Sequence, residues 1–206
     1  MKGVTVPLVS QAGSHRKLRF HEAPGPQPRQ FFLYTPTTLQ RGAPLVISVH
    51  GIARNAPAHA YRLMEQAERF GLALVAPFFE KRHYGQYQQL SDEECGARAD
   101  LALIDIAEAA AALTGADASQ LLLFGFSGGA QFAHRFVLAH PRRALGAVLA
   151  AAGWYTFPSH DVPYPYGLAS PPSNLTLDLV GALATPQHVL VGEFDTDRDH
   201  SLRRDA

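Results

Sequence analysis

The sequence predicts an α/β fold with a mostly parallel central sheet and helices on both faces. Short apolar runs rich in Val, Leu, Ile and Phe alternate with helical segments along the chain. The runs are continuous instead of alternating in polarity, which is typical of strands covered on both faces. The helical segments carry proline near their starts or glycine just after their ends, the usual signals of helix boundaries.

The predicted elements follow one another in a regular order. We expect strands over residues 31–34, 45–49, 72–78, 120–126, 145–152 and 188–192. We expect helices from Pro57 to Phe70, from about Arg98 to Leu113, from Ser127 to Pro141 and from about Leu175 to Leu183. Residues 21–30 and 155–173 are rich in proline and are predicted as loops. Strands that alternate with helices imply right-handed crossovers and a layered α/β fold.

Composition limits the classes of protein to which the chain can belong. Its 206 residues suit a single domain over 1–206, and 47% hydrophobic with 17% charged residues exclude a disordered chain. Eighteen basic residues balance 18 acidic ones, so no basic field favours nucleic acid or anionic lipid as a partner. No run is long enough to span a bilayer. The pattern does not indicate an oligomeric state.

One cysteine, Cys95, allows no internal disulfide, and no metal-ligand spacing accompanies it. The first residues lack the apolar run of an export signal. We therefore expect a cytoplasmic protein with no metal and no other cofactor.

The strongest chemical motif is Gly125-Phe126-Ser127-Gly128-Gly129, placed between a predicted strand and a predicted helix. It matches G-x-S-x-G in its required strand–turn–helix context, with Ser127 as the nucleophile on a sharp turn. The small Gly125 and Gly129 would let strand and helix pack closely. The backbone N–H of Gly128, at a helix N-terminus, would stabilise a developing oxyanion.

Two further motifs follow predicted strands. His50-Gly51-Ile52 follows the 45–49 strand, where the N–H of Ile52 could be the second oxyanion donor and His50 would be structural. Asp195 follows the last predicted strand and could orient an imidazole, with Asp197 as its competitor for that role. Trp154, Tyr155 and the aromatic 155–173 loop could bind substrate over the site or simply cover the sheet.

These motifs together resemble the α/β-hydrolase family, and most closely its esterase and polyhydroxybutyrate-depolymerase-like branch. The resemblance covers about residues 31–195 and implies hydrolysis of small-molecule or polymeric carboxylic esters through an acyl-serine. The family's order of nucleophile, acid and histidine is met for the first two members, Ser127 and Asp195.

The family's histidine comes after one further helix and strand, whereas this chain stops eleven residues after Asp195. No histidine matches that position, and His200 lies too close to the acid in sequence. We therefore expect the sequence to be truncated, with a longer form that carries the histidine. The alternative is a catalytically silent binding module of the same fold, because a serine without a base is a poor nucleophile. Dinucleotide binding is disfavoured because Ser127 stands where G-x-G-x-x-G needs glycine.

Overall fold

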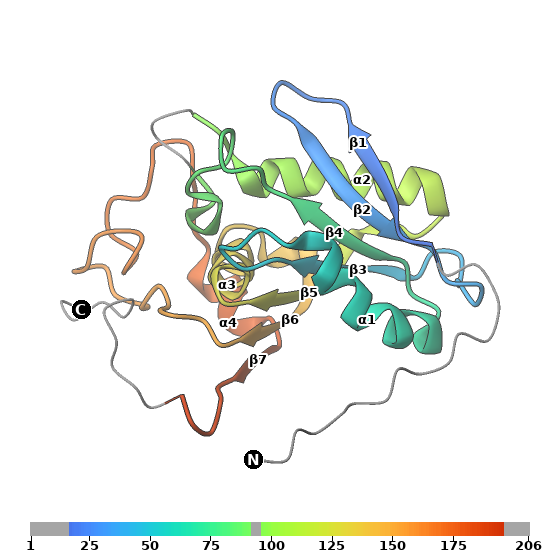
Figure 1. The fold of residues 1–206 in the computed structure, drawn as a ribbon. Helices are drawn as coiled ribbons and strands as arrows, with labels where there is room; N and C mark the ends of the chain where they lie inside the picture. Colours follow the sequence, from blue (N-terminus) through green and yellow to red (C-terminus); the bar gives the residue numbers. More distant parts are fainter. Residues whose placement is uncertain (1–16, 92–95, 196–206) are drawn as a thin grey trace, which may run out of the picture.

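The computed structural model describes residues 17–91 and 96–195, which fold around one seven-stranded sheet (Figure 1). The strands are β1 (Arg19–Ala23), β2 (Arg29–Tyr34), β3 (Pro44–Val49), β4 (Leu74–Phe78), β5 (Asp117–Phe126), β6 (Ala144–Ala150) and β7 (Gln187–Leu190). The helices are α1 (Ala56–Phe70), α2 (Ala99–Thr114), α3 (Gly128–Ala139) and α4 (Leu179–Ala184), with short 3-10 turns η1 (Tyr87–Gln89) and η2 (Pro141–Arg143).

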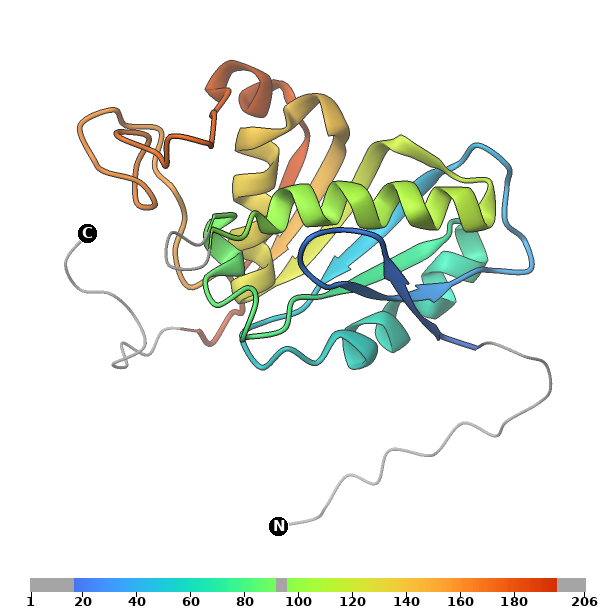
Figure 2. The same ribbon diagram turned by 90° about the horizontal axis from the view of Figure 1, so that it is seen from above.

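The sheet order is β1-β2-β4-β3-β5-β6-β7. Five neighbouring strands, β4, β3, β5, β6 and β7, run parallel to one another. The predicted fold class is therefore confirmed, including the mostly parallel sheet. Helix α1 lies on one face, whereas α2 and α3 lie on the other (Figure 2). The larger core fills the space under α2 and α3, and a smaller one joins α1 to β2 and β4.

The expectation of a loop over residues 21–30 was wrong at both ends. Strands β1 and β2 form an antiparallel hairpin in which Arg19 pairs with Leu33 and Ala23 pairs with Arg29. The prolines at 24, 26 and 28 fall inside the hairpin turn, where no ladder hydrogen bond is required of them. Proline density therefore marked the turn correctly but overstated its length.

Several other boundaries differ from the sequence prediction by two to four residues, and two of these differences have a clear local cause. Strand β6 ends at Ala150 instead of residue 152, because Ala151 takes a positive φ of 49° and leaves the extended conformation. Helix α4 begins at Leu179 instead of Leu175, because the side chain of Asp178 accepts a hydrogen bond from the N–H of Gly181 at 2.9 Å and caps the helix there.

Helix α1 shows why some boundaries were predictable. Asn55 accepts a hydrogen bond from the N–H of Ala58 at 3.3 Å, Pro57 lies in the first turn, and Gly71 ends the helix at φ 66°. Each residue type supplies what its position requires: a side-chain acceptor, a preset φ and a left-handed cap.

Part of the sheet is open on the α1 face. A cavity of about 550 Å³ lies there, and its lining comes mainly from β5, β6 and β7, including Phe124, Leu145 and Val148. All four residues of β7 are exposed, and β7 is the last strand in the sheet order. Among the described residues, no helix covers this part of the face.

Candidate active site

Ser127 occupies the sharp corner between β5 and α3. Its backbone angles are φ 54° and ψ −119°, a conformation that residues with a side chain rarely adopt. The corner is held on both sides: the N–H of Ser127 donates to the carbonyl of Ala150 at 2.9 Å, and its own carbonyl accepts from Ala130 at 2.9 Å. The strain is therefore supported by neighbouring backbone, and the side chain remains half-buried.

The two glycines that flank the serine permit the close packing of this corner. A Cβ atom at Gly125 would lie 2.1 Å from the carbonyl oxygen of Gly129, and one at Gly129 would lie 2.2 Å from that of Val49. Both distances are far below van der Waals contact. Helix α3 can approach β3 and β5 this closely only because neither position carries a side chain.

The turn after β3 lies directly beside the serine. A Cβ atom built on Gly51 would lie 3.5 Å from the Cβ of Ser127, and one built on Gly128 would lie 3.4 Å from the amide nitrogen of Ile52. The structure thus brings Ser127, Gly128 and Ile52 together. The amide of Gly128 is in the first turn of α3, where N–H groups have no partner within the helix.

His50 holds this turn in place and is fully buried. Its Nε2 accepts a hydrogen bond from the N–H of Phe79 at 3.1 Å, so its Nδ1 carries the proton and donates to the carbonyl of Gly51 at 2.9 Å. Burial lowers the pKa of His50 to about 4, although the bond to Gly51 opposes that shift. The imidazole is therefore neutral at physiological pH and has both nitrogens engaged.

Tyr87 contributes a contact that the sequence did not indicate. Its hydroxyl donates to the carbonyl of His50 at 2.8 Å and would lie 2.8 Å from a Cβ on Gly128. Arg54 lies over the Tyr87 ring, with its guanidinium carbon 4.9 Å from the ring centre. Tyr87 belongs to the short η1 turn, far from Ser127 in sequence, so no local motif marks it.

Among the described residues, no imidazole contacts the predicted acid. Asp195 is exposed in a turn after β7, where its N–H donates to the carbonyl of Gly192 at 3.1 Å. Asp197 and His200 lie outside the described residues. Within the described part of the chain, the structure gives no contact between Asp195 and any histidine.

Three other described histidines have polar partners elsewhere, and a fourth lies near the corner. His134 lies 3.2 Å from the carbonyl of Thr156, and His140 lies 2.7 Å from the buried carboxylate of Asp100. His83 contacts Gln27 and Glu80. His59 of α1 packs near the nucleophile corner, with its ring 5.8 Å from that of Phe126. None of these contacts reaches the Ser127 hydroxyl.

The predicted substrate residues begin the long segment after β6. Trp154 is half-buried between Arg135, whose guanidinium carbon is 4.1 Å from its ring centre, and Tyr166, whose ring is 4.6 Å away. Tyr155 stands edge-on to His134 at 5.3 Å. Its hydroxyl is buried without a hydrogen-bond partner among the described residues, and burial raises its pKa.

A separate hollow of about 500 Å³ opens beside the residues that follow Ile52. Arg54 and Asn55 form part of its rim, and Phe20, Phe32 and Phe78 supply aromatic wall. Besides the surface of Trp154 and Tyr155, this hollow is a second apolar surface, and it lies close to the turn that carries the Ile52 amide.

Comparison with solved structures shows which proteins this chain resembles in fold. The structure aligns with poly(aspartic acid) hydrolase-1 from Sphingomonas sp. KT-1 at a TM-score of 0.78 and 26% identity, over 91% of this chain and 76% of that one. This is an α/β-hydrolase fold. The structure also aligns with a poly(3-hydroxybutyrate) depolymerase from Bordetella parapertussis at a TM-score of 0.66 and 24% identity, over 81% of this chain and 60% of that one.

An acetyl xylan esterase from Aspergillus awamori aligns at a TM-score of 0.53 and 18% identity, over 66% of this chain and 53% of that one. The predicted α/β-hydrolase fold is thereby confirmed, and the similarity to the poly(aspartic acid) hydrolase at 26% identity supports a hydrolase of the α/β type. This chain spans only three fifths or less of the depolymerase and the esterase. No family model matches the sequence. No curated protein matches it either.

Residues 17–91 and 96–195 contain no group of three or more His, Cys, Asp or Glu side chains placed to hold a metal ion. They also contain no helix with the length and apolar character needed to cross a membrane.

Proposed function

We propose that this α/β-hydrolase-fold chain is a serine hydrolase of carboxylic esters, with Ser127 as the nucleophile. The observation that carries the proposal is the strained corner at φ 54° and ψ −119°, set beside the amides of Gly128 and Ile52. Such strain costs on the order of 1–3 kcal/mol and is retained where function requires it. A merely connecting turn between a strand and a helix has no need of it.

The proposed reaction follows from this geometry. The Ser127 oxygen attacks the ester carbonyl carbon, and the carbonyl oxygen becomes an oxyanion that accepts hydrogen bonds from the two amides. Collapse of the tetrahedral intermediate expels the alcohol, which takes up the proton lost by the serine, and leaves an acyl-serine. Water then repeats the attack and releases the acid.

The proton needs a base, which we expect to be a histidine oriented by Asp195 or Asp197. Four described histidines, His50, His83, His134 and His140, have polar partners away from Ser127. For the substrate, we propose a small-molecule or polymeric ester whose acyl or alcohol group packs against Trp154 and Tyr155. Residues 155–173 would then form a loop over the site within a single domain.

The test is hydrolysis of 4-nitrophenyl acetate and butyrate by the parent and by Ser127→Ala, with Ser119→Ala as the matched control. Ser119 is an exposed serine earlier in the same strand, β5. We expect Ser127→Ala to remove the activity and Ser119→Ala to retain it. Equal rates for the parent and Ser127→Ala would exclude Ser127 as the nucleophile.

The second candidate is a catalytically silent module that uses the aromatic surface of Trp154 and Tyr155 for binding. It is favoured by the exposed position of Asp195, which contacts no histidine among the described residues. Labelling with a fluorophosphonate separates the two functions, because the reagent reacts only with an activated serine. Covalent modification of Ser127 supports the hydrolase, whereas an unlabelled chain that still binds an ester supports the silent module.

A further inference from the structure

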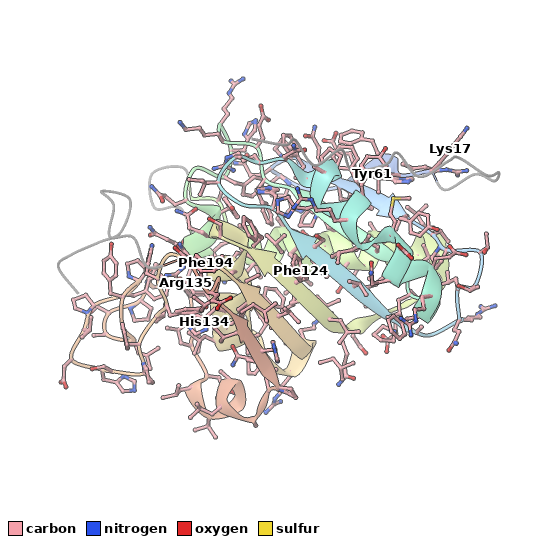
Figure 3. The ribbon with its side chains drawn as sticks, turned by 60° about the horizontal axis from the view of Figure 1, so that its bottom comes forward. Lys17, Tyr61, Phe124, His134, Arg135 and Phe194 are labelled. Atoms are coloured by element: carbon pink, nitrogen blue, oxygen red, sulfur yellow. The ribbon has the colours of Figure 1, made fainter. Side chains whose placement is uncertain are left out.

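Arg135 is a buried cation whose partners are not acids. It lies on α3, two turns beyond Ser127, and has no exposed surface (Figure 3). Its Nε donates to the hydroxyl of Thr156 at 2.9 Å, and one terminal nitrogen donates to the carbonyl of Gln88 at 2.7 Å. The other terminal nitrogen reaches the carbonyl of Pro165 at 3.4 Å. Among the described residues it forms no salt bridge with a carboxylate.

A buried guanidinium that only filled the interior would reduce the free energy of unfolding, because its charge has been removed from water. Burial lowers the pKa of Arg135 to about 10, which reflects the cost of removing the charge from water. An apolar side chain of similar volume often costs no stability at such a position. An apolar side chain cannot provide the planar set of donors by which Arg135 joins η1, α3 and residues 153–173, the segment that follows β6.

The same guanidinium also lies against the only tryptophan of the chain. Its central carbon is 4.1 Å from the Trp154 ring centre, within the range of a cation–π contact. Thr156, two residues later, connects Arg135 to Pro165: its hydroxyl accepts from Arg135 and donates to the carbonyl of Pro165 at 2.7 Å. Trp154 is therefore held by its contact with the Arg135 guanidinium, which Thr156 of the same segment binds through its hydroxyl.

The linkage extends to the amide side of the proposed site. Gln88 and Gln89 belong to η1, and the hydroxyl of Tyr164 donates to the carbonyl of Gln89 at 2.6 Å. The neighbouring Tyr87 touches both Gly128 and the carbonyl of His50. Arg135 and Tyr164 thus fasten the 153–173 segment to the same short turn whose Tyr87 lies beside Gly128.

We propose that Arg135 is a positioning residue that sets the substrate preference of the site by fixing Trp154 as its aromatic wall. The inference rests on the proposed function, both for its catalytic readout and for the assignment of Trp154 to the substrate surface. It further assigns the acyl group of the substrate, and not the alcohol, to Trp154: an acyl group with an aromatic ring gains from a fixed Trp154, whereas an acetyl group is too small to reach it. Loss of Arg135 would therefore weaken the larger substrate selectively.

The experiment compares Arg135→Met and Arg135→Lys with Arg69→Met. Arg69 is a matched control because it also lies over an aromatic ring, that of Phe70 at 5.4 Å, but is exposed at the end of α1. We measure kcat and KM for 4-nitrophenyl acetate and 4-nitrophenyl phenylacetate, together with the emission of Trp154. For Arg135→Met we expect about a tenfold greater loss of kcat/KM for phenylacetate, mainly through KM, and red-shifted emission. For Arg135→Lys we expect a loss of kcat/KM between those of the parent and Arg135→Met, because lysine keeps the charge without the planar donors.

A binding measurement separates this inference from the proposed function. In a Ser127→Ala background, 4-nitrophenyl phenylacetate quenches Trp154 as it binds, so its affinity is obtained without turnover. We expect about tenfold weaker binding when Arg135→Met is added and no change with Arg69→Met. If the parent shows no serine-dependent hydrolysis, the proposed function fails while this titration still decides the role of Arg135.

Unchanged emission and unchanged affinity in Arg135→Met would overturn the inference, and so would equal losses for both esters. Thr156→Val provides a second route should Arg135→Met fail to fold. It removes the hydroxyl that Arg135 contacts and leaves the cation in place. We expect it to shift substrate preference in the same direction, by two- to threefold, and no shift in this folded variant would equally count against the inference.

Discussion

The backbone strain at Ser127 predicts that glycine at this position is more stable than alanine. Its φ of 54° with ψ of −119° is the conformation of the first central residue of a type II′ turn, where glycine dominates. A side chain at this position costs about 1–3 kcal/mol. Glycine removes that cost, but its greater freedom in the unfolded chain offsets about 0.5–1 kcal/mol of the gain.

The net expectation is that Ser127→Gly exceeds Ser127→Ala in free energy of unfolding by about 1 kcal/mol. For a chain of this length the corresponding rise in Tm is about 2–4 °C. Neither variant retains the hydroxyl, so neither should hydrolyse esters. The comparison isolates backbone strain, because both substitutions remove the same oxygen and differ by one methyl group.

Urea unfolding followed by circular dichroism measures the difference. The control pair is Ser119→Gly and Ser119→Ala at an exposed position of β5 with ordinary backbone angles, where glycine should be the less stable of the two. If Ser127→Gly is no more stable than Ser127→Ala, the corner is not strained. The argument for a nucleophile at this position would then lose its main support.

Two further predictions concern the neighbouring turn. Gly129→Ala places a Cβ 2.2 Å from the carbonyl oxygen of Val49, so we expect a loss of more than about 3 kcal/mol in urea unfolding or an insoluble chain. The control Gly42→Ala meets open space and should cost only about 1–2 kcal/mol for its positive φ. For His50, the unfolded imidazole takes up a proton below pH 6.5 while the folded one stays neutral down to about pH 4. The free energy of unfolding should therefore fall by about 3 kcal/mol between pH 7 and pH 4, and His50→Asn should flatten that slope. A wild-type slope in His50→Asn would contradict the assigned burial.

The sequence predicted most of the fold because its signals act over short distances. The apolar runs predicted the strands from β2 to β7, and Pro57 with the glycine after Phe70 marked the ends of α1, since helix boundaries depend on a few adjacent residues. Strand β1 was missed because its pairing with β2 lies across a proline-rich turn. Pairing of this kind is decided by the partner strand, which local composition does not describe.

The candidate site divides in the same way. By itself the sequence determined the glycine–serine corner and the turn after β3, because a sharp strand-to-helix turn restricts residue types within five positions. Only the tertiary structure showed that Ile52 lies against Gly128, that Tyr87 contacts Gly128 and the carbonyl of His50, and that Asp195 is exposed. The same holds for Arg135, whose partners Gln88, Thr156 and Pro165 are brought together by the packing of separate segments around α3. A hydrogen bond or a ring contact depends on distance in space, and folding brings residues close that the chain keeps far apart.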